Sequence, residues 1–138
     1  RFKVLHNEES REKLGQFLKD TYLNTSAKPQ QFTANKMYNN PVKSAAVIAI
    51  CMQREPEESL PEWEEVAAVA MAVQNMWLSC AELGIGAYWS SPGLISQMHN
   101  FFDMQPGERC LGFFYMGYYT ETPPDSVRGP IAEKTVWL

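Results

Sequence analysis

The stretch that decides the fold is Glu64–Pro92, which reads EEVAAVAMAVQNMWLSCAELGIGAYWSSP. Apolar residues recur at helical spacing from Val66 to Leu83, and acidic residues precede them, which predicts a long helix. We expect Gly84 to end this helix, because glycine readily takes the left-handed conformation of a helix C-terminus. A short aromatic strand, Gly86–Ser90, is predicted to follow and to lead into a turn of small residues.

The predicted helix is apolar almost all the way round between Val66 and Leu83. Such a helix has to be buried on more than one side. A small sheet covers one side only, and an exposed stripe of this size would promote aggregation. We therefore expect this long buried helix to lie at a subunit interface of a homodimer.

The rest of the chain predicts an α+β sandwich with helices packed on a sheet. The polar, proline-bearing segment Asn24–Val42 is expected to be a long loop, with at most a helical turn or two. Further strands are predicted at Phe2–His6, Ser44–Gln53 and Glu108–Tyr118, and further helices at Glu8–Tyr22 and Pro92–Phe102.

Composition limits the class of protein. The chain has 138 residues, of which 45% are hydrophobic and 20% charged, so we expect one domain over residues 1–138. A net charge of -4 without a basic cluster argues against a nucleic-acid partner. The three cysteines are widely spaced in apolar runs, which favours buried, reduced thiols and a cytoplasmic location. The long helix is interrupted by Gln74-Asn75 and is shorter than the ~20 residues of a membrane span, so no membrane association is expected.

The chain begins at Arg1, directly before a predicted strand. Domains do not usually start in a central strand. We therefore expect an N-terminal segment to precede this residue.

The common catalytic and metal motifs have no counterpart in the sequence. His6 and His99 are too far apart and too poorly supported by acidic residues to predict a metal site, and Cys80 has no basic neighbour to activate it. Gly84 and Gly86 follow a helix and precede a strand, the reverse of the order in a dinucleotide-binding fingerprint. We predict no catalytic side chain and no metal ligand.

A binding site for a flat cofactor is predicted at the turn after the short strand. Ser90 and Ser91 lie where a strand turns into a helix, so backbone amides there can meet an acceptor. A flavin suits such a site, because the cofactor itself carries out the redox chemistry. An ordinary turn with capping serines is the alternative. Arg128, between Val127 and Gly129-Pro130, could grip a phosphate, although a solvent-facing arginine explains it equally well.

Taken together, these segments resemble the nitroreductase family of FMN-dependent dimeric oxidoreductases. The central block is the most specific part: Ala70–Leu83 (AMAVQNMWLSCAEL) is similar to the central helix of the family, and Gly84–Trp89 (GIGAYW) to its Gly-x-Gly-x-x-Trp turn. The opening strand, the strand Leu111–Tyr118 and the tail with its arginine and Trp137 also match in order.

The resemblance implies a mixed, mostly antiparallel sheet flanked by helices, a homodimer, and one FMN in each interfacial cleft. Trp89, Ser90 and Ser91 fall where smaller family members contact the flavin ring, and Arg128 falls at a phosphate-binding position of the tail. The phosphate-binding Arg-Arg-Ser motif of the family has no counterpart after Arg1.

The activity that this resemblance implies is hydride transfer from NAD(P)H, through flavin N5, to a nitroaromatic, quinone or similar small-molecule acceptor, by a ping-pong mechanism. Two alternatives stay open. One is a reductive specialist of the same fold, such as a flavin-destroying or dehalogenating enzyme. The other is a non-catalytic dimeric module that binds a flavin or another ligand.

Overall fold

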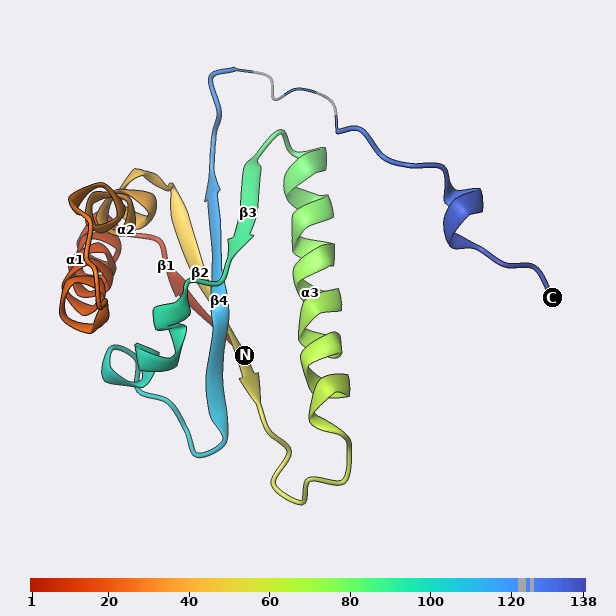
Figure 1. Cartoon of the computed structure of the whole chain (residues 1–138), viewed down its shortest axis with the longest axis horizontal. Coiled ribbons are helices and arrows are strands. Elements are labelled where there is room, and N and C mark those ends of the chain that lie inside the picture. The colour runs from red at the N-terminus through yellow and green to blue at the C-terminus, as the bar shows by residue number, and fades with distance from the viewer. Residues whose placement is uncertain (122–123, 125) are drawn as a thin grey trace.

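The computed structural model describes residues 1–121, 124 and 126–138, and a four-stranded sheet forms its centre. The strands are β1 (Phe2–Leu5), β2 (Ala46–Gln53), β3 (Gly86–Ser90) and β4 (Glu108–Gly117), in the spatial order β1-β2-β4-β3. Each neighbouring pair is antiparallel (Figure 1). The predicted α+β fold with a mostly antiparallel sheet is therefore confirmed.

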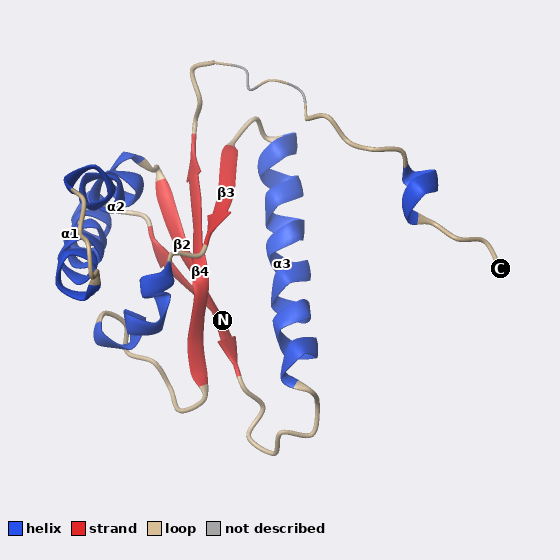
Figure 2. Ribbon diagram, in the orientation of Figure 1, coloured by secondary structure: helices blue, strands red, loops and turns tan. Residues whose placement is uncertain are grey.

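Helices cover both faces of this sheet (Figure 2). One face carries α1 (Glu8–Thr25), with α2 (Gln31–Lys43) beside it, and the 3-10 helix η1 (Gly93–Asn100). The other face carries α3 (Glu62–Glu82). Each face has its own apolar core, because alternate residues of the central strands point to opposite sides. A sheet enclosed in this way explains why β2 and β4 are rich in aliphatic and aromatic residues.

The helix α2 corrects the prediction of a loop at Asn24–Val42. Local signals for α2 are weak: its N-cap residue, Gln30, makes no side-chain capping bond, and Pro41 lies in its last turn. Packing against α1 compensates, since Ala34 is fully buried and a Cβ atom at Gly15 of α1 would lie 2.7 Å from the carbonyl oxygen of Tyr38. The missing side chain at Gly15 therefore lets the two helices approach closely, a tertiary contact that no local pattern encodes.

The ends of α3 agree with the sequence prediction. The helix starts directly after Pro61 and carries three glutamates in its first turn, where the helix dipole favours negative charge. Gly84 has a φ of 67°, and the amide of Ile85 donates to the carbonyl of Cys80 at 2.8 Å, so the helix closes at the predicted glycine.

Burial of α3 is one-sided in the single chain. Val73 and Cys80 pack against the sheet and are buried. The opposite side is exposed, with Met71 at 64% and Leu78 at 60% of full exposure. Within one chain, the predicted burial of α3 is therefore seen only on the side that packs on the sheet.

After β4 the chain leaves the body of the domain and ends in an extended tail with a short 3-10 helix, η2 (Ile131–Lys134) (Figure 1). Its apolar residues are exposed, including Trp137 at 91%. In the described part of the chain, no helix combines the length and the apolar character that crossing a bilayer requires.

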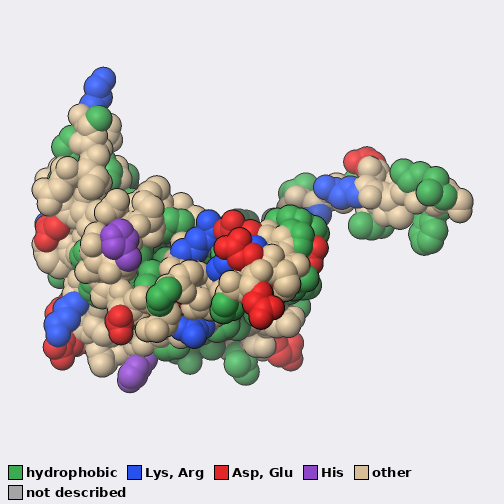
Figure 3. Space-filling view, turned by 90° about the horizontal axis from the view of Figure 1, so that it is seen from below, with side chains coloured by type: hydrophobic (Ala, Val, Ile, Leu, Met, Phe, Trp, Pro, Cys, Tyr) green, Lys and Arg blue, Asp and Glu red, His purple; other side chains and the backbone are tan. Residues whose placement is uncertain are grey.

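Charged side chains gather on the surface of the molecule that faces the viewer in Figure 3, which shows it from below. Basic and acidic groups lie side by side on this surface (Figure 3). Arg54 bonds to Glu65 at 2.7 Å, and Arg109 pairs with Glu62. This surface is therefore electrostatically mixed, unlike the basic face of a nucleic-acid-binding protein.

Candidate functional site

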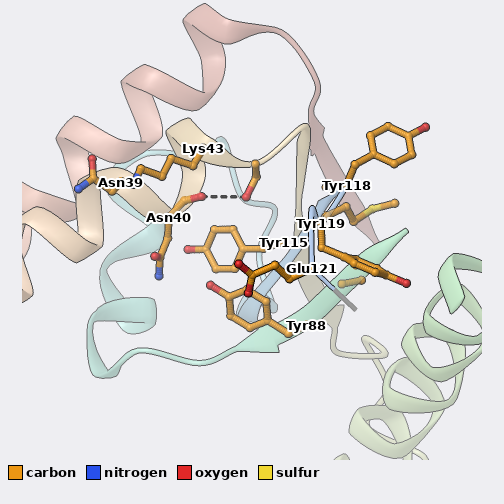
Figure 4. A pocket seen from close by; sticks show the side chains of 13 residues that line it. Asn39, Asn40, Lys43, Tyr88, Tyr115, Tyr118, Tyr119 and Glu121 are labelled. Atoms are coloured by element: carbon orange, nitrogen blue, oxygen red, sulfur yellow. Dashed lines mark hydrogen bonds between the residues drawn. The ribbon is translucent and has the colours of Figure 1, made fainter. Parts of the chain in front are cut away.

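A cavity of about 440 Å³ lies between the end of α2 and the edge of the sheet formed by β3 and β4. Its volume falls within the range of small-molecule sites, which is about 300–1,000 Å³. Figure 4 shows the side chains that line it, contributed by α2, β3, β4 and the first residues of the tail.

Two tyrosines form one wall of this cavity. Tyr88 on β3 lies directly opposite Tyr115 on β4, and their ring centroids are 5.2 Å apart with an interplanar angle of 31°. Burial raises the pKa of Tyr88 and, more strongly, that of Tyr115. Both hydroxyls therefore keep their protons at neutral pH and can donate hydrogen bonds to a bound molecule.

A third aromatic ring, that of Tyr119, also lines the cavity beside β3. A Cβ atom at Gly86 would lie 2.8 Å from a ring carbon of Tyr119. Gly86 therefore has a packing role at this site, separate from the helix-ending role of Gly84.

The last turn of α2 supplies polar groups to the cavity. Asn39, Asn40 and Lys43 line it, and the side chain of Asn40 lies beside the tyrosine rings (Figure 4). The backbone carbonyl of Asn40 accepts a hydrogen bond from the hydroxyl of Ser44 at 2.8 Å, which ties the helix end to the start of β2. The same three α2 residues line a neighbouring cavity of about 350 Å³, so these polar side chains border both cavities.

The turn after β3 is held against an irregularity in β4. The pairing of β2 with β4 shifts at Leu111, and the freed Leu111 carbonyl accepts from the Trp89 indole at 3.4 Å and from the Ser91 hydroxyl at 3.0 Å. Gly112 has a φ of 147°, and a Cβ atom there would lie 2.5 Å from the carbonyl oxygen of Ser90. The missing side chain at Gly112 therefore allows the turn to lie directly on β4.

The sequence-predicted site residues fall into two groups. Trp89, Ser90 and Ser91 lie together at the end of β3 and in the turn after it, with the Trp89 ring packed in the core cluster on the α3 side of the sheet. Arg128 lies in the exposed tail, which leads away from the body, so one chain does not bring it beside β3 (Figure 1). Contact of these residues with a flavin stays a prediction.

Sequence reasoning missed the residues that line the cavity. The strand alternation could have placed Tyr88 on the opposite face from Trp89. Asn39 and Asn40 were not predicted, because they lie in the segment Asn24–Val42 that was expected to be a loop, and Lys43 directly follows that segment. Among the residues that the structure describes, no three histidine, cysteine or acidic side chains gather in a possible metal site.

The chain is similar to known proteins over most of its length. The model described as the nitroreductase family matches residues 1–118. A Bacillus subtilis (strain 168) protein, provisionally named NAD(P)H nitroreductase YfhC, is 30% identical over 83 residues, which are 59% of this chain and 43% of the relative. The matched segment thus spans less than half of that protein.

Solved structures agree with this match. A nitroreductase-like family protein from Bacillus cereus is 26% identical with a TM-score of 0.76, over 100% of this chain and 72% of that chain. Nitroreductase CinD from Lactococcus lactis, solved in complex with chloramphenicol, has a TM-score of 0.74 at 15% identity, over 100% and 76% of the two chains. A nitroreductase from Bacteroides fragilis with bound FMN has a TM-score of 0.68 at 14% identity, over 100% and 75%.

Proposed function

This chain belongs to the nitroreductase family, and from that premise we propose that it is part of an FMN-dependent oxidoreductase. Hydride from NAD(P)H would be passed to a nitroaromatic, quinone or similar acceptor, in two half-reactions that share one cleft. The name of the Bacillus subtilis relative, the FMN in the Bacteroides fragilis structure and the chloramphenicol in the Lactococcus lactis structure support this proposal.

The observation that carries the proposal is the cavity with two stacked tyrosines on one side and the polar end of α2 on the other. A flavin has a flat aromatic ring system with polar edges. The rings of Tyr88 and Tyr115, tilted by 31° to each other, offer an aromatic wall, and the amide of Asn40 offers both a donor and an acceptor. The residues of this structure therefore fit the ring portion of FMN.

The phosphate of FMN needs cationic partners. In this cavity Lys43 supplies a positive charge. Arg128 would be the second partner, reaching the site from the tail of a neighbouring subunit. Ser90 and Ser91 do not line this cavity; from the turn at the end of β3 they would meet the edge of a ring that extends past Tyr88. Trp89, on the other face of the sheet, would act as a positioning residue of that turn.

When bound, FMN would supply the redox chemistry, and the protein residues would bind, orient and exclude water. The tyrosine hydroxyls, whose pKa values are raised by burial, would serve as neutral hydrogen-bond donors to ligands. No side chain of this chain is assigned as an acid or a nucleophile.

We further propose a homodimer joined through α3. The exposed side of this helix carries Trp63, Met71 and Leu78, each of which is at least 60% exposed in the single chain. Covering each of these side chains would contribute roughly 1.5–3 kcal/mol. The apolar tail, which ends in Trp137-Leu138, would pack on the partner and carry Arg128 with it.

The test begins with flavin binding by the intact purified protein. We expect the protein to carry FMN, or to take up added FMN and quench its fluorescence. A colourless protein that binds no added FMN would overturn the proposal.

The second step separates an enzyme from a binding module. Under anaerobic conditions, NADH or NADPH should bleach the flavin absorption, and a nitroaromatic or quinone should restore it. A protein that binds FMN but shows neither change is the non-catalytic module. A panel that includes halogenated acceptors would identify a dehalogenating specialist.

A further inference from the structure

Two of the three cysteines face each other across the middle of the sheet. Cys51 on β2 is the register partner of Cys110 on β4, and both side chains belong to the core on the α1 side. Both are free thiols. Cys80 lies in the separate core on the α3 side and therefore serves as an internal comparison.

The backbone pairing of these two residues, which adjoins the irregularity at Leu111, is of a type that a disulfide can bridge. The amide of Cys51 donates to the carbonyl of Arg1 at 3.0 Å, and the carbonyl of Cys51 accepts from the Arg1 nitrogen at 2.9 Å. Both backbone groups of Cys51 thus point toward β1, so Cys51 and Cys110 form a non-hydrogen-bonded pair. In such pairs the Cα atoms are about 4.5 Å apart and the side chains are at their closest. Disulfides accept Cα separations of roughly 4.4–6.8 Å.

The two thiols also interact with each other. A hydrogen bond from Cys110 lowers the pKa of Cys51, and the pKa of Cys110 rises in return. The pair therefore gives up its first proton more easily than an isolated thiol and its second less easily. The Cys110 thiol also donates to the Gly112 carbonyl at 3.4 Å, and the Cys51 thiol faces the Ala49 carbonyl at 3.9 Å.

One of the two sulfurs can be reached from outside the core. Cys110 lines a cavity of about 490 Å³ between η1 and β4, whereas Cys51 is fully buried behind it. Cys110 keeps 6% of its full exposure. A small oxidant that enters the cavity therefore meets Cys110 first and finds Cys51 next to it.

We propose that Cys51 and Cys110 are a reversible redox pair that hydrogen peroxide converts into an intramolecular disulfide. As the Cys110 sulfur attacks one peroxide oxygen, an S–O bond forms and the O–O bond breaks, and the departing hydroxide takes the Cys110 thiol proton and leaves as water. Cys51 then attacks the oxidised sulfur, so that the S–S bond forms, the S–O bond breaks and a second water leaves. Two thiols are oxidised, and one peroxide is reduced to two waters. A dithiol reductant reverses the change by exchange.

The experiment treats the reduced intact protein with hydrogen peroxide, removes the peroxide, alkylates the remaining thiols and maps the peptides by mass spectrometry. We expect a disulfide-linked pair of peptides that contain Cys51 and Cys110, which disappears after treatment with dithiothreitol. Cys80 should be recovered in alkylated form. Oxidation of Met104, which lines the same cavity as Cys110, to its sulfoxide shows that the peroxide reached that cavity.

Variants complete the test. Cys80→Ser should form the same cross-link, and Cys51→Ser and Cys110→Ser should lose it. Because a serine at any of these three core positions can unfold the chain, the peptide map of the wild type decides the matter by itself. Recovery of Cys51 and Cys110 as separate alkylated or oxygenated residues would overturn the proposal, whether Met104 is oxidised or the peroxide fails to enter the cavity. A cross-link to Cys80 would overturn it as well.

Discussion

Replacement of Gly112 by alanine tests the packing of the turn after β3 against β4. The backbone at Gly112 has a φ of 147°, in a region that side chains other than glycine rarely occupy. Forcing alanine into such a conformation costs about 1–3 kcal/mol. The new methyl group would also lie 2.5 Å from the Ser90 carbonyl oxygen and 2.9 Å from the Ser91 hydroxyl, so the turn has to move.

Overpacking of this kind adds about 1–3 kcal/mol, so we expect Gly112→Ala to lower the free energy of unfolding by about 2–6 kcal/mol. The midpoint of thermal unfolding should fall by roughly 10–20 °C. Guanidinium titration followed by far-UV circular dichroism measures the change. Flavin binding should weaken as well, because the displaced residues include Ser90 and Ser91.

Gly117→Ala is the matched control on the same strand. The nearest atom to a Cβ there is the Ala45 nitrogen at 3.6 Å, which is an ordinary contact. We expect a change within about 0.5 kcal/mol, as for a site without a strained backbone or a clash. If Gly112→Ala unfolds at the same denaturant concentration as Gly117→Ala, the described packing of this turn is wrong.

Three further changes test the site, the dimer and the pH dependence. Arg128→Ala should weaken FMN binding roughly 10- to 100-fold through loss of charge-assisted hydrogen bonds but leave riboflavin binding unchanged, because riboflavin has no phosphate; equal losses in titrations of both ligands would contradict its phosphate role. Leu78→Glu should shift the protein toward monomers in analytical ultracentrifugation with an unchanged circular dichroism spectrum, since this side chain is 60% exposed in the single chain; an unchanged mass would argue against an interface on this side of α3. A hydrogen bond from Arg54 lowers the pKa of Glu65 from its ordinary value of 4.5, so its stabilisation is present above that pH and is lost as the pH falls through the lower folded-state value. Glu65→Gln should therefore flatten the decline of unfolding free energy below about pH 4.5 in denaturant titrations, and an unchanged slope would exclude this contribution.

The agreement between sequence and structure is best where the signals are local. The acidic first turn of α3 and the closing Gly84 lie within a few residues of the helix ends that they define. The apolar run Ala46–Gln53 forms β2 because aliphatic residues suit a strand that is covered on both faces. A short window of sequence contains all the information that these features need.

The sequence predicted a loop where the structure has α2, because this helix depends on contacts between distant segments rather than on local signals. Asn24–Val42 lacks a strong cap and contains proline, so local preference favoured a loop. The helix forms because Gly15 of α1 leaves room for the backbone of Tyr38, a contact between segments far apart in the chain. As a consequence, the polar side of the cavity, with Asn40 and Lys43, could not be predicted from the sequence.

Local sequence patterns are enough to predict the class of fold, the long helix, the strand that follows it and the position of the turn that carries Ser90 and Ser91. Backbone preferences and hydrophobic periodicity act over a few residues, so a linear pattern is enough to specify them. Three contacts become visible only in the folded chain: Tyr88 lies against Tyr115, Asn40 lies beside these rings, and Cys51 lies opposite Cys110. These contacts depend on the strand register and on the docking of α2, which join residues that are distant in the sequence.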